Sequence, residues 1–123
     1  MITIMDAIQA LKPGAECLVR GDTYSGIEWL DKSQKQPTED EVNAKVTELT
    51  NAEPMNLLRQ ERDYRISKSD WRVTKAKETS TNIPAAWKTY RQALRDLPAS
   101  STPTLDSNGY LNMSSVTWPT EPS

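Results

Sequence analysis

A stripe of five large apolar side chains in the second half of the chain limits its fold most strongly. The stripe consists of Ile83, Trp87, Tyr90, Leu94 and Leu97. Spacings of four, three, four and three residues place all five on one face of an α-helix. We therefore predict a helix over residues 83–97, with Pro84 in its first turn and Pro98 at its stop.

A longer helix is predicted to begin at Thr38. The hydroxyl of Thr38 can cap the first turn while Glu41 reaches back to it, and the acids at 39–41 suit the positive end of a helix dipole. A helix start explains these acids better than a pair of catalytic carboxylates does. An apolar row then continues the helix through Val42, Val46 and Leu49.

The longer helix is predicted to continue beyond Pro54. We expect one helix that bends near Pro54 and runs to about Lys68, followed by a polar loop over residues 70–82. One face of this helix carries Met55, Leu58, Arg62 and Ile66. Two amphipathic helices joined by a loop bury their stripes most easily against each other, so we predict an antiparallel helical hairpin with Trp87 buried against Leu58, Ile66 or Trp71.

The N-terminal segment predicts a small unit that contains both a helix and strands. Residues 3–11 fit a short helix with a Thr3–Asp6 capping box, stopped by Pro13-Gly14. Residues 15–20 and 24–30 alternate as strands do, and Gly21-Asp22 supplies a turn between them. A two-stranded hairpin is marginal alone, so we expect it to rest on the helix.

The C-terminal segment is rich in Ser, Thr and Pro, a composition that by itself favours an extended tail. Asp106-Ser107-Asn108-Gly109 is a turn signal between Leu105 and Leu111, so a short hairpin is possible there. Few apolar groups are available to offset the entropy of ordering the tail. We expect it to be loose in the isolated protein and fixed by a partner, with Trp118 as the anchor.

The predicted fold class is α+β and mainly helical: an N-terminal helix plus β-hairpin, an antiparallel helical hairpin and an extended tail. The predicted divisions are residues 1–36, 37–98 and 99–123. No catalytic residue, cofactor or metal ligand is predicted, because the chain has no His and a single cysteine, Cys17. Neither an apolar run of membrane-spanning length nor a signal segment is found, which predicts a protein made in a cytosol.

The charge is divided unevenly along the chain. Residues 1–56 carry 5 basic and 10 acidic side chains, residues 57–95 carry 10 basic and 4 acidic ones, and the remainder carries three acids. This division suits head-to-tail contact between copies or contact with an oppositely charged neighbour, although two ordinary solvated faces fit equally well. Within the hairpin we expect Arg59 to pair with Asp63, and Arg91 or Arg95 to pair with Asp63 or Asp70.

Two motifs of the hairpin carry a resemblance. R-D-x-x-I-x-x-S-D-W at residues 62–71 and A-W-x-x-Y-R-Q-A-L-R-D-L-P at residues 86–98 resemble a domain of bacteriophage tail-fibre-associated and tail assembly chaperone-like proteins. The closing V-T-W-P at residues 116–119 is similar to the tail that often follows this domain, whereas the segment after Trp71 departs from the family pattern. The N-terminal part resembles the openings of small virion proteins of marine phages.

The resemblance implies a phage protein that acts by contact with other phage structural proteins, in many copies, in the virion after synthesis in the host cytoplasm. The first hypothesis is an accessory structural subunit of tail or capsid. The alternatives are a tail or tail-fibre assembly chaperone that is not retained, and a basic nucleic-acid-binding helper. The expected partner-binding residues are Trp71, Trp87, Tyr90, Arg91, Arg95, Tyr110 and Trp118. For Trp87 and Tyr90, core packing is the stronger interpretation.

Overall fold

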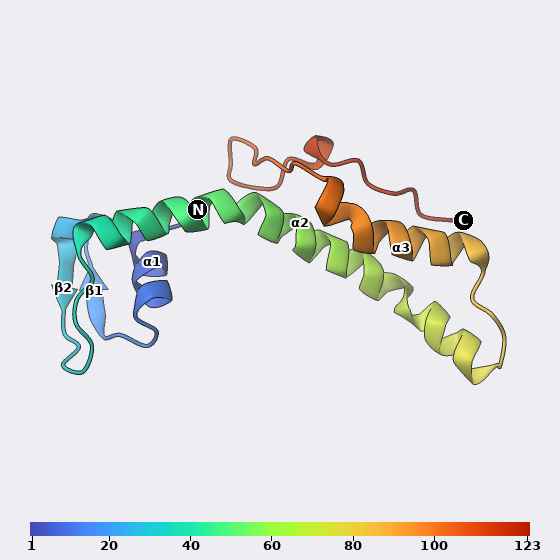
Figure 1. Cartoon of the computed structure of the whole chain (residues 1–123), viewed down its shortest axis with the longest axis horizontal. Coiled ribbons are helices and arrows are strands. Elements are labelled where there is room, and N and C mark those ends of the chain that lie inside the picture. Colours follow the sequence, from blue (N-terminus) through green and yellow to red (C-terminus); the bar gives the residue numbers. More distant parts are fainter. The chain divides into compact units, whose positions relative to one another are not determined.

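The computed structural model describes residues 1–123 and contains three α-helices and one two-stranded antiparallel sheet, which confirms the predicted mainly helical α+β class (Figure 1). The chain forms two compact units. Unit 1 comprises Met1–Glu53 and unit 2 comprises Pro54–Ser123. The boundary lies inside helix α2 (Glu39–Glu78), which contributes its first part to unit 1 and the rest to unit 2. The three-part division at residues 36 and 98 stays a prediction.

Unit 1 packs helix α1 (Ile4–Leu11) and a hairpin against the beginning of α2. The capping box is confirmed, because Asp6 N–H donates to the Thr3 hydroxyl and Thr3 N–H donates to the Asp6 carboxylate. Ala7, Ile8 and Val42 form the core of the unit. They are covered by partly buried apolar neighbours from α1, the hairpin and α2: Ile4, Leu11, Cys17, Val19, Tyr24, Ile27, Trp29 and Val46.

The two strands are shorter than predicted. Strand β1 is Cys17–Val19 and strand β2 is Ile27–Trp29, paired so that Cys17 faces Trp29 and Val19 faces Ile27. The prediction of a strand from residue 24 was wrong, because residues 24–26 form a 3-10 turn that brings the chain back. A Cβ at Gly26 would collide with the carbonyl oxygen of Arg20, so this close return depends on glycine.

A clamp centred on Asp31 fixes the segment after β2. The Asp31 carboxylate accepts backbone N–H groups from Glu16 at 3.0 Å, Ser33 at 2.8 Å and Gln34 at 2.9 Å. These donors, the Gln34 N–H foremost, lower the pKa of Asp31 to about 2. The Trp29 indole also donates to the Gln34 carbonyl, so one polar cluster joins the ends of the hairpin to the segment that leads into α2.

Helix α2 starts as predicted but ends ten residues later than expected. Thr38 and Glu41 form the capping pair, and Pro54 lies inside the helix. The prediction of a loop over residues 70–82 was wrong for residues 70–78, since α2 continues to Glu78 and the connection to α3 is confined to residues 79–84. Two polar side chains of this stretch, Asp70 and Arg72, find partners on α3, as described below, and such tertiary contacts outweigh a polar composition.

Helix α3 (Ala85–Ser100) buries the predicted stripe. Pro84 lies one residue before the helix, at its N-cap. The expectation that Pro98 ends the helix was wrong by two residues. A proline disturbs only the bond to the residue four positions earlier, and here that cost falls in the last turn. The carbonyl of Pro98 accepts the N–H of Ser101 and closes the helix.

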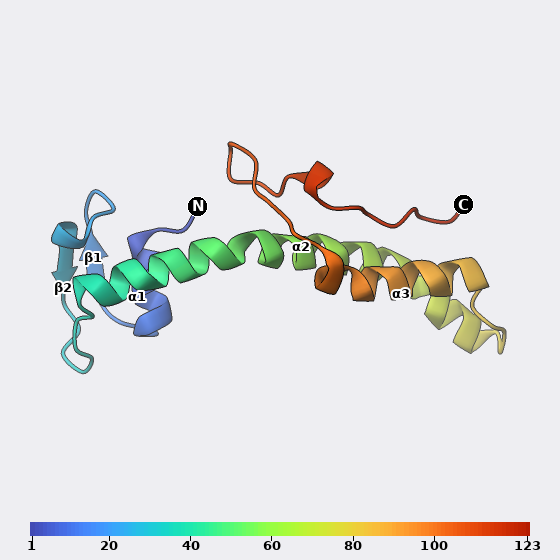
Figure 2. The same ribbon diagram turned by 45° about the horizontal axis from the view of Figure 1, so that its top comes forward.

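The core of unit 2 consists of two adjoining apolar clusters in which the second part of α2 packs against α3. The first joins Leu58, Leu97 and Val116, with Met55, Leu111 and Trp118 against them. The second joins Trp87, Tyr90 and Leu94, with Ile66, Ile83 and Trp118 against them. Figures 1 and 2 both show α3 alongside the second part of α2, which confirms the antiparallel hairpin.

The tail after α3 folds back onto this hairpin. Leu105 and Leu111 pair across the predicted turn, where Gly109 has a left-handed φ of 84° and the Asp106 carboxylate accepts the N–H groups of Asn108 and Tyr110. A 3-10 turn at Met113–Ser115 then leads to buried Val116. In this structure the tail is therefore held by the chain's own α2–α3 pair, whereas we had expected a partner protein to hold it.

Candidate protein-binding site

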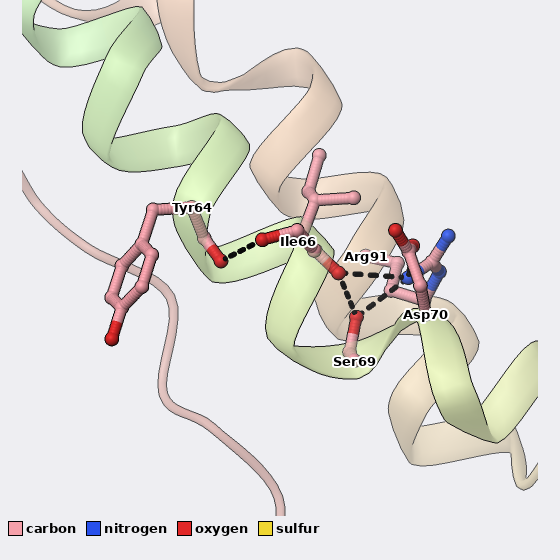
Figure 3. Close-up of polar contacts among 6 residues, drawn as sticks. Tyr64, Ile66, Ser69, Asp70 and Arg91 are labelled. Carbon is pink, nitrogen blue, oxygen red and sulfur yellow. Dashed lines mark hydrogen bonds and ion pairs between the residues drawn. The ribbon is translucent and has the colours of Figure 1, made fainter.

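A polar network crosses the hairpin at Arg91 (Figure 3). One guanidinium nitrogen of Arg91 donates to the Ser69 hydroxyl at 2.6 Å, the Asp70 carboxylate at 2.8 Å and the Ile66 carbonyl at 3.2 Å. Ser69 is almost fully buried and itself donates to the Ile66 carbonyl at 2.7 Å. Arg91 therefore takes the second of its two predicted partners and locks α3 to α2.

The other predicted ion pairs differ. Asp63 is paired with its neighbour Arg62 at 2.6 Å, and not with Arg59. Arg95 forms no ion pair and instead donates to the Gln92 side-chain oxygen at 2.8 Å. Arg59 therefore stays unpaired, and Arg95 keeps its charge available at the surface of α3.

Three of the four tryptophans lie against arginines of α2. The Arg72 guanidinium is 4.4 Å from the Trp71 ring and 3.8 Å from the Trp87 ring, and the Arg65 guanidinium is 4.2 Å from the Trp118 ring. Such stacks are worth about 0.5–1 kcal/mol where the ring is exposed, as at Trp71, and up to about 2 kcal/mol where it is buried, as at Trp87. Two of the cations of α2, Arg65 and Arg72, thus hold the tail and α3.

Two of the expected partner-binding residues are buried. Trp87 is 4% exposed and Tyr90 is 5% exposed, and their rings meet edge to face with centroids 5.6 Å apart. Trp118 is partly buried in both apolar clusters. These three side chains lie beneath the surface of unit 2, and in this conformation only a small part of them is accessible to a partner.

The exposed aromatic groups form a row along α2. Trp71 is 53% exposed, and Tyr64, which sequence reasoning missed, is 57% exposed. Lys68 lies 4.8 Å from the Tyr64 ring and Lys75 lies 5.9 Å from the Trp71 ring. Tyr64, Lys68, Trp71 and Lys75 are spaced by four, three and four residues, and we call them the aromatic-basic face. The sequence contains this spacing, but it was not recognised because the helix was expected to end before Trp71.

A second exposed apolar area lies where the tail crosses α2. Tyr110 is 71% exposed, and with Met113 and Leu57 it borders an open hollow of about 350 Å³. Arg95 lies elsewhere, in a groove between α2 and α3 with a volume of about 720 Å³. The structure therefore distributes the expected binding residues over three surfaces of unit 2 instead of gathering them at one point.

The chemistry of a metal or nucleophile site is not evident. No three side chains of His, Cys, Asp or Glu come together as metal ligands. Burial, and to a smaller degree the nearby Asp31 carboxylate, raise the pKa of Cys17, which disfavours the reactive thiolate. No helix combines the length and apolar character needed to cross a bilayer.

The surfaces above belong to a region with a family match. The family model described as phage tail assembly chaperone protein matches residues 55–123, more than half of the chain and nearly all of unit 2. The chain belongs to the phage tail assembly chaperone family. This confirms the resemblance carried by the motifs at 62–71 and 86–98. No curated protein and no solved structure matches the chain.

The match assigns a role in phage tail assembly to this chaperone-family chain. The aromatic core, the Arg91 network, the arginine stacks and the tail all fall within the matched span. Unit 1, Met1–Glu53, lies entirely outside the matched span, which begins within α2 at residue 55. The matched span therefore includes Trp71 and Tyr110, the two aromatic residues of the expected set that are exposed.

Proposed function

We propose that this chain assists tail assembly without catalysis, by binding a phage tail protein reversibly through the aromatic-basic face and the exposed area around Tyr110. The carrying observation is that the family match covers the unit on which both surfaces lie. Of the residues expected to bind a partner, Trp71 and Tyr110 make direct contact in this proposal. Trp87, Tyr90, Arg91 and Trp118 shape the surface from beneath.

The chemistry of these surfaces defines the partner. Tyr, Trp and Met are enriched where proteins bind each other, and the flanking cations favour carboxylates. Residues 54–123 carry ten basic and seven acidic side chains, so unit 2 has a net charge of +3. A tail-protein segment with apolar side chains and acidic flanks fits this surface, because it covers Trp71 and Tyr64 while its carboxylates meet Lys68 and Lys75.

Binding is tested with the isolated tail proteins of the phage and two double variants. Tyr64→Ala with Trp71→Ala should weaken binding by about tenfold to a hundredfold, the loss typical of exposed aromatic anchors. Leu18→Ala with Leu30→Ala removes two half-exposed apolar side chains from unit 1 and serves as the control. Equal affinities for the two double variants would exclude the aromatic-basic face as the site.

We propose further that the chain acts in the host cytoplasm and leaves before the particle is complete. The exposed groups are few and interspersed with cations, which suits a contact that forms and dissolves. A mass-spectrometric inventory of purified virions tests this step. The chain should be absent or scarce relative to the tail proteins, and a fixed stoichiometric amount would contradict release.

The second candidate is a retained accessory subunit, present in many copies. Tyr110 and Met113 favour it, because large apolar side chains left bare on a small protein are the kind of surface that a permanent contact covers. The same inventory decides between the two candidates. A nucleic-acid-binding helper would instead bind single-stranded DNA of mixed sequence with a steep loss of affinity in salt, which we do not expect from this chain.

A further inference from the structure

The groove between α2 and α3 carries cations that the fold leaves unpaired. It is bordered by Val73 and Ile83 on one side and by Lys88, Arg91 and Arg95 of α3. Asp96 also lines it and accepts a hydrogen bond from the Gln92 side chain at 2.9 Å, so the groove carries three cations and one carboxylate. Arg91 is engaged with Asp70, whereas Lys88 and Arg95 make no ion pair. On another flank of α3, the end of the tail at residues 119–123 borders a separate hollow.

The two free cations have a fixed spacing. Lys88 and Arg95 are seven residues apart on one helix, which separates them by ~10 Å along its axis, two turns apart on nearly the same side. Val73 is partly exposed beside them and offers an apolar contact. The complementary surface is a helix with two carboxylates at the same spacing and a small residue between them, so that the backbones approach closely.

The first part of α2 presents this pattern. Glu41 and Glu48 are also seven residues apart on one helix, both are exposed, and Ala44 lies exposed between them. Their local partners are the Thr38 cap and Lys45, and such surface contacts are weak and easily exchanged. Unit 1 carries five basic and ten acidic side chains, a net charge of −5, whereas the net charge of unit 2 is +3.

We propose that copies of this chain associate head to tail, with Glu41 and Glu48 of one copy docked on Lys88 and Arg95 of the next. The surfaces differ, so the interface is heterologous and leads to rings or open chains of copies. Because the pairs are exposed, association depends strongly on ionic strength. This inference is independent of the proposed client site, which lies on another surface of unit 2.

Sedimentation velocity on the whole protein tests the proposal. The unmodified chain should associate at low ionic strength and dissociate as salt is added. Lys88→Glu with Arg95→Glu should weaken association by about tenfold or more, since two attractive pairs become repulsive. Arg59→Glu with Lys77→Glu changes the net charge equally at exposed, unpaired sites outside the groove and should associate normally.

A reciprocal exchange identifies the two surfaces. Glu41→Lys with Glu48→Lys should also lose association, and an equimolar mixture with the Lys88→Glu, Arg95→Glu variant should regain it. Glu41→Gln with Glu48→Gln keeps the helix cap and should weaken association, which separates charge from folding. A monomeric unmodified chain, normal association of the groove variant, or no recovery on mixing folded variants would each overturn the proposal.

Discussion

The two units solve the problem of a small core in different ways. Unit 1 has an aliphatic core of Ala7, Ile8 and Val42, and backbone hydrogen bonds to Asp31 tie the two ends of its hairpin together. Unit 2 has an aromatic core in which arginines of α2 stack on tryptophans of α3 and the tail. The first unit is stabilised by small buried groups and backbone hydrogen bonds. The second is stabilised by contacts between long side chains of segments that are distant in the sequence.

This difference matters for function because the family match falls on unit 2. A core built from long, amphipathic side chains continues to the surface, since each stacked arginine or tryptophan also has an exposed edge or neighbour. Unit 1 buries small groups completely and offers half-exposed Leu18 and Leu30 outside. The binding surface that we propose on unit 2 is thus the outer layer of its own core.

The largest expected effect is at Trp87. Trp87→Ala removes a buried ring that contacts Tyr90 and Arg72, and should cost roughly 3–5 kcal/mol of unfolding free energy. Hydrogen exchange should show loss of protection in α3 and the tail, with α1 and the hairpin unchanged. A thermal midpoint equal to that of the unmodified chain would show that the ring is not a core residue.

A smaller effect is expected at Arg91. Arg91→Ala deprives buried Ser69 and the Asp70 carboxylate of a donor and should destabilise unit 2 by about 1–3 kcal/mol. Arg95→Ala, four residues away and exposed, is the matched control and should change stability by less than about 0.5 kcal/mol. Urea unfolding of both variants separates the two roles, and equal losses would mean that the network contributes nothing specific.

The smallest expected effect is a loss of stability of unit 1 at low pH, which depends on Asp31. The pKa of Asp31 is lowered to about 2 by backbone donors, so the ionised form stabilises the fold above the usual pKa of an aspartate. That contribution should be lost as the pH falls from about 4 toward 2. Asp31→Asn should remove this part of the pH dependence, measured as exchange protection of residues 16 and 33–34, and leave unit 2 unaffected.

Local signals predicted much of this fold. The stripe from Ile83 to Leu97 fixed the buried face of α3, and the caps at Thr3 and Thr38 gave both helix starts correctly. These features depend on residues within four positions of one another. They can be read from a sequence because the partners that satisfy them lie in the same short window.

The rest depends on contacts between distant residues. Residues 70–78 look like a loop until Arg72 is placed on Trp87 and Asp70 beside Arg91, and no local pattern shows either contact. The tail was expected to need a partner because its own apolar groups are few. Its docking relies on Leu58 and Leu97, which lie far away in the sequence. Of the expected binding residues, Trp71 and Tyr110 proved exposed, whereas Trp87 and Tyr90 proved buried.

The position of Arg72 gives this protein a built-in reporter. One guanidinium touches the exposed indole of Trp71 and the buried indole of Trp87, at 4.4 and 3.8 Å from the ring centres. A molecule that covers Trp71 changes the solvent around this shared cation, and the change reaches a ring that it never contacts. The fluorescence of Trp87, read in a Trp29→Phe, Trp71→Phe, Trp118→Phe variant that keeps an aromatic ring beside Arg72, would therefore register events at the surface.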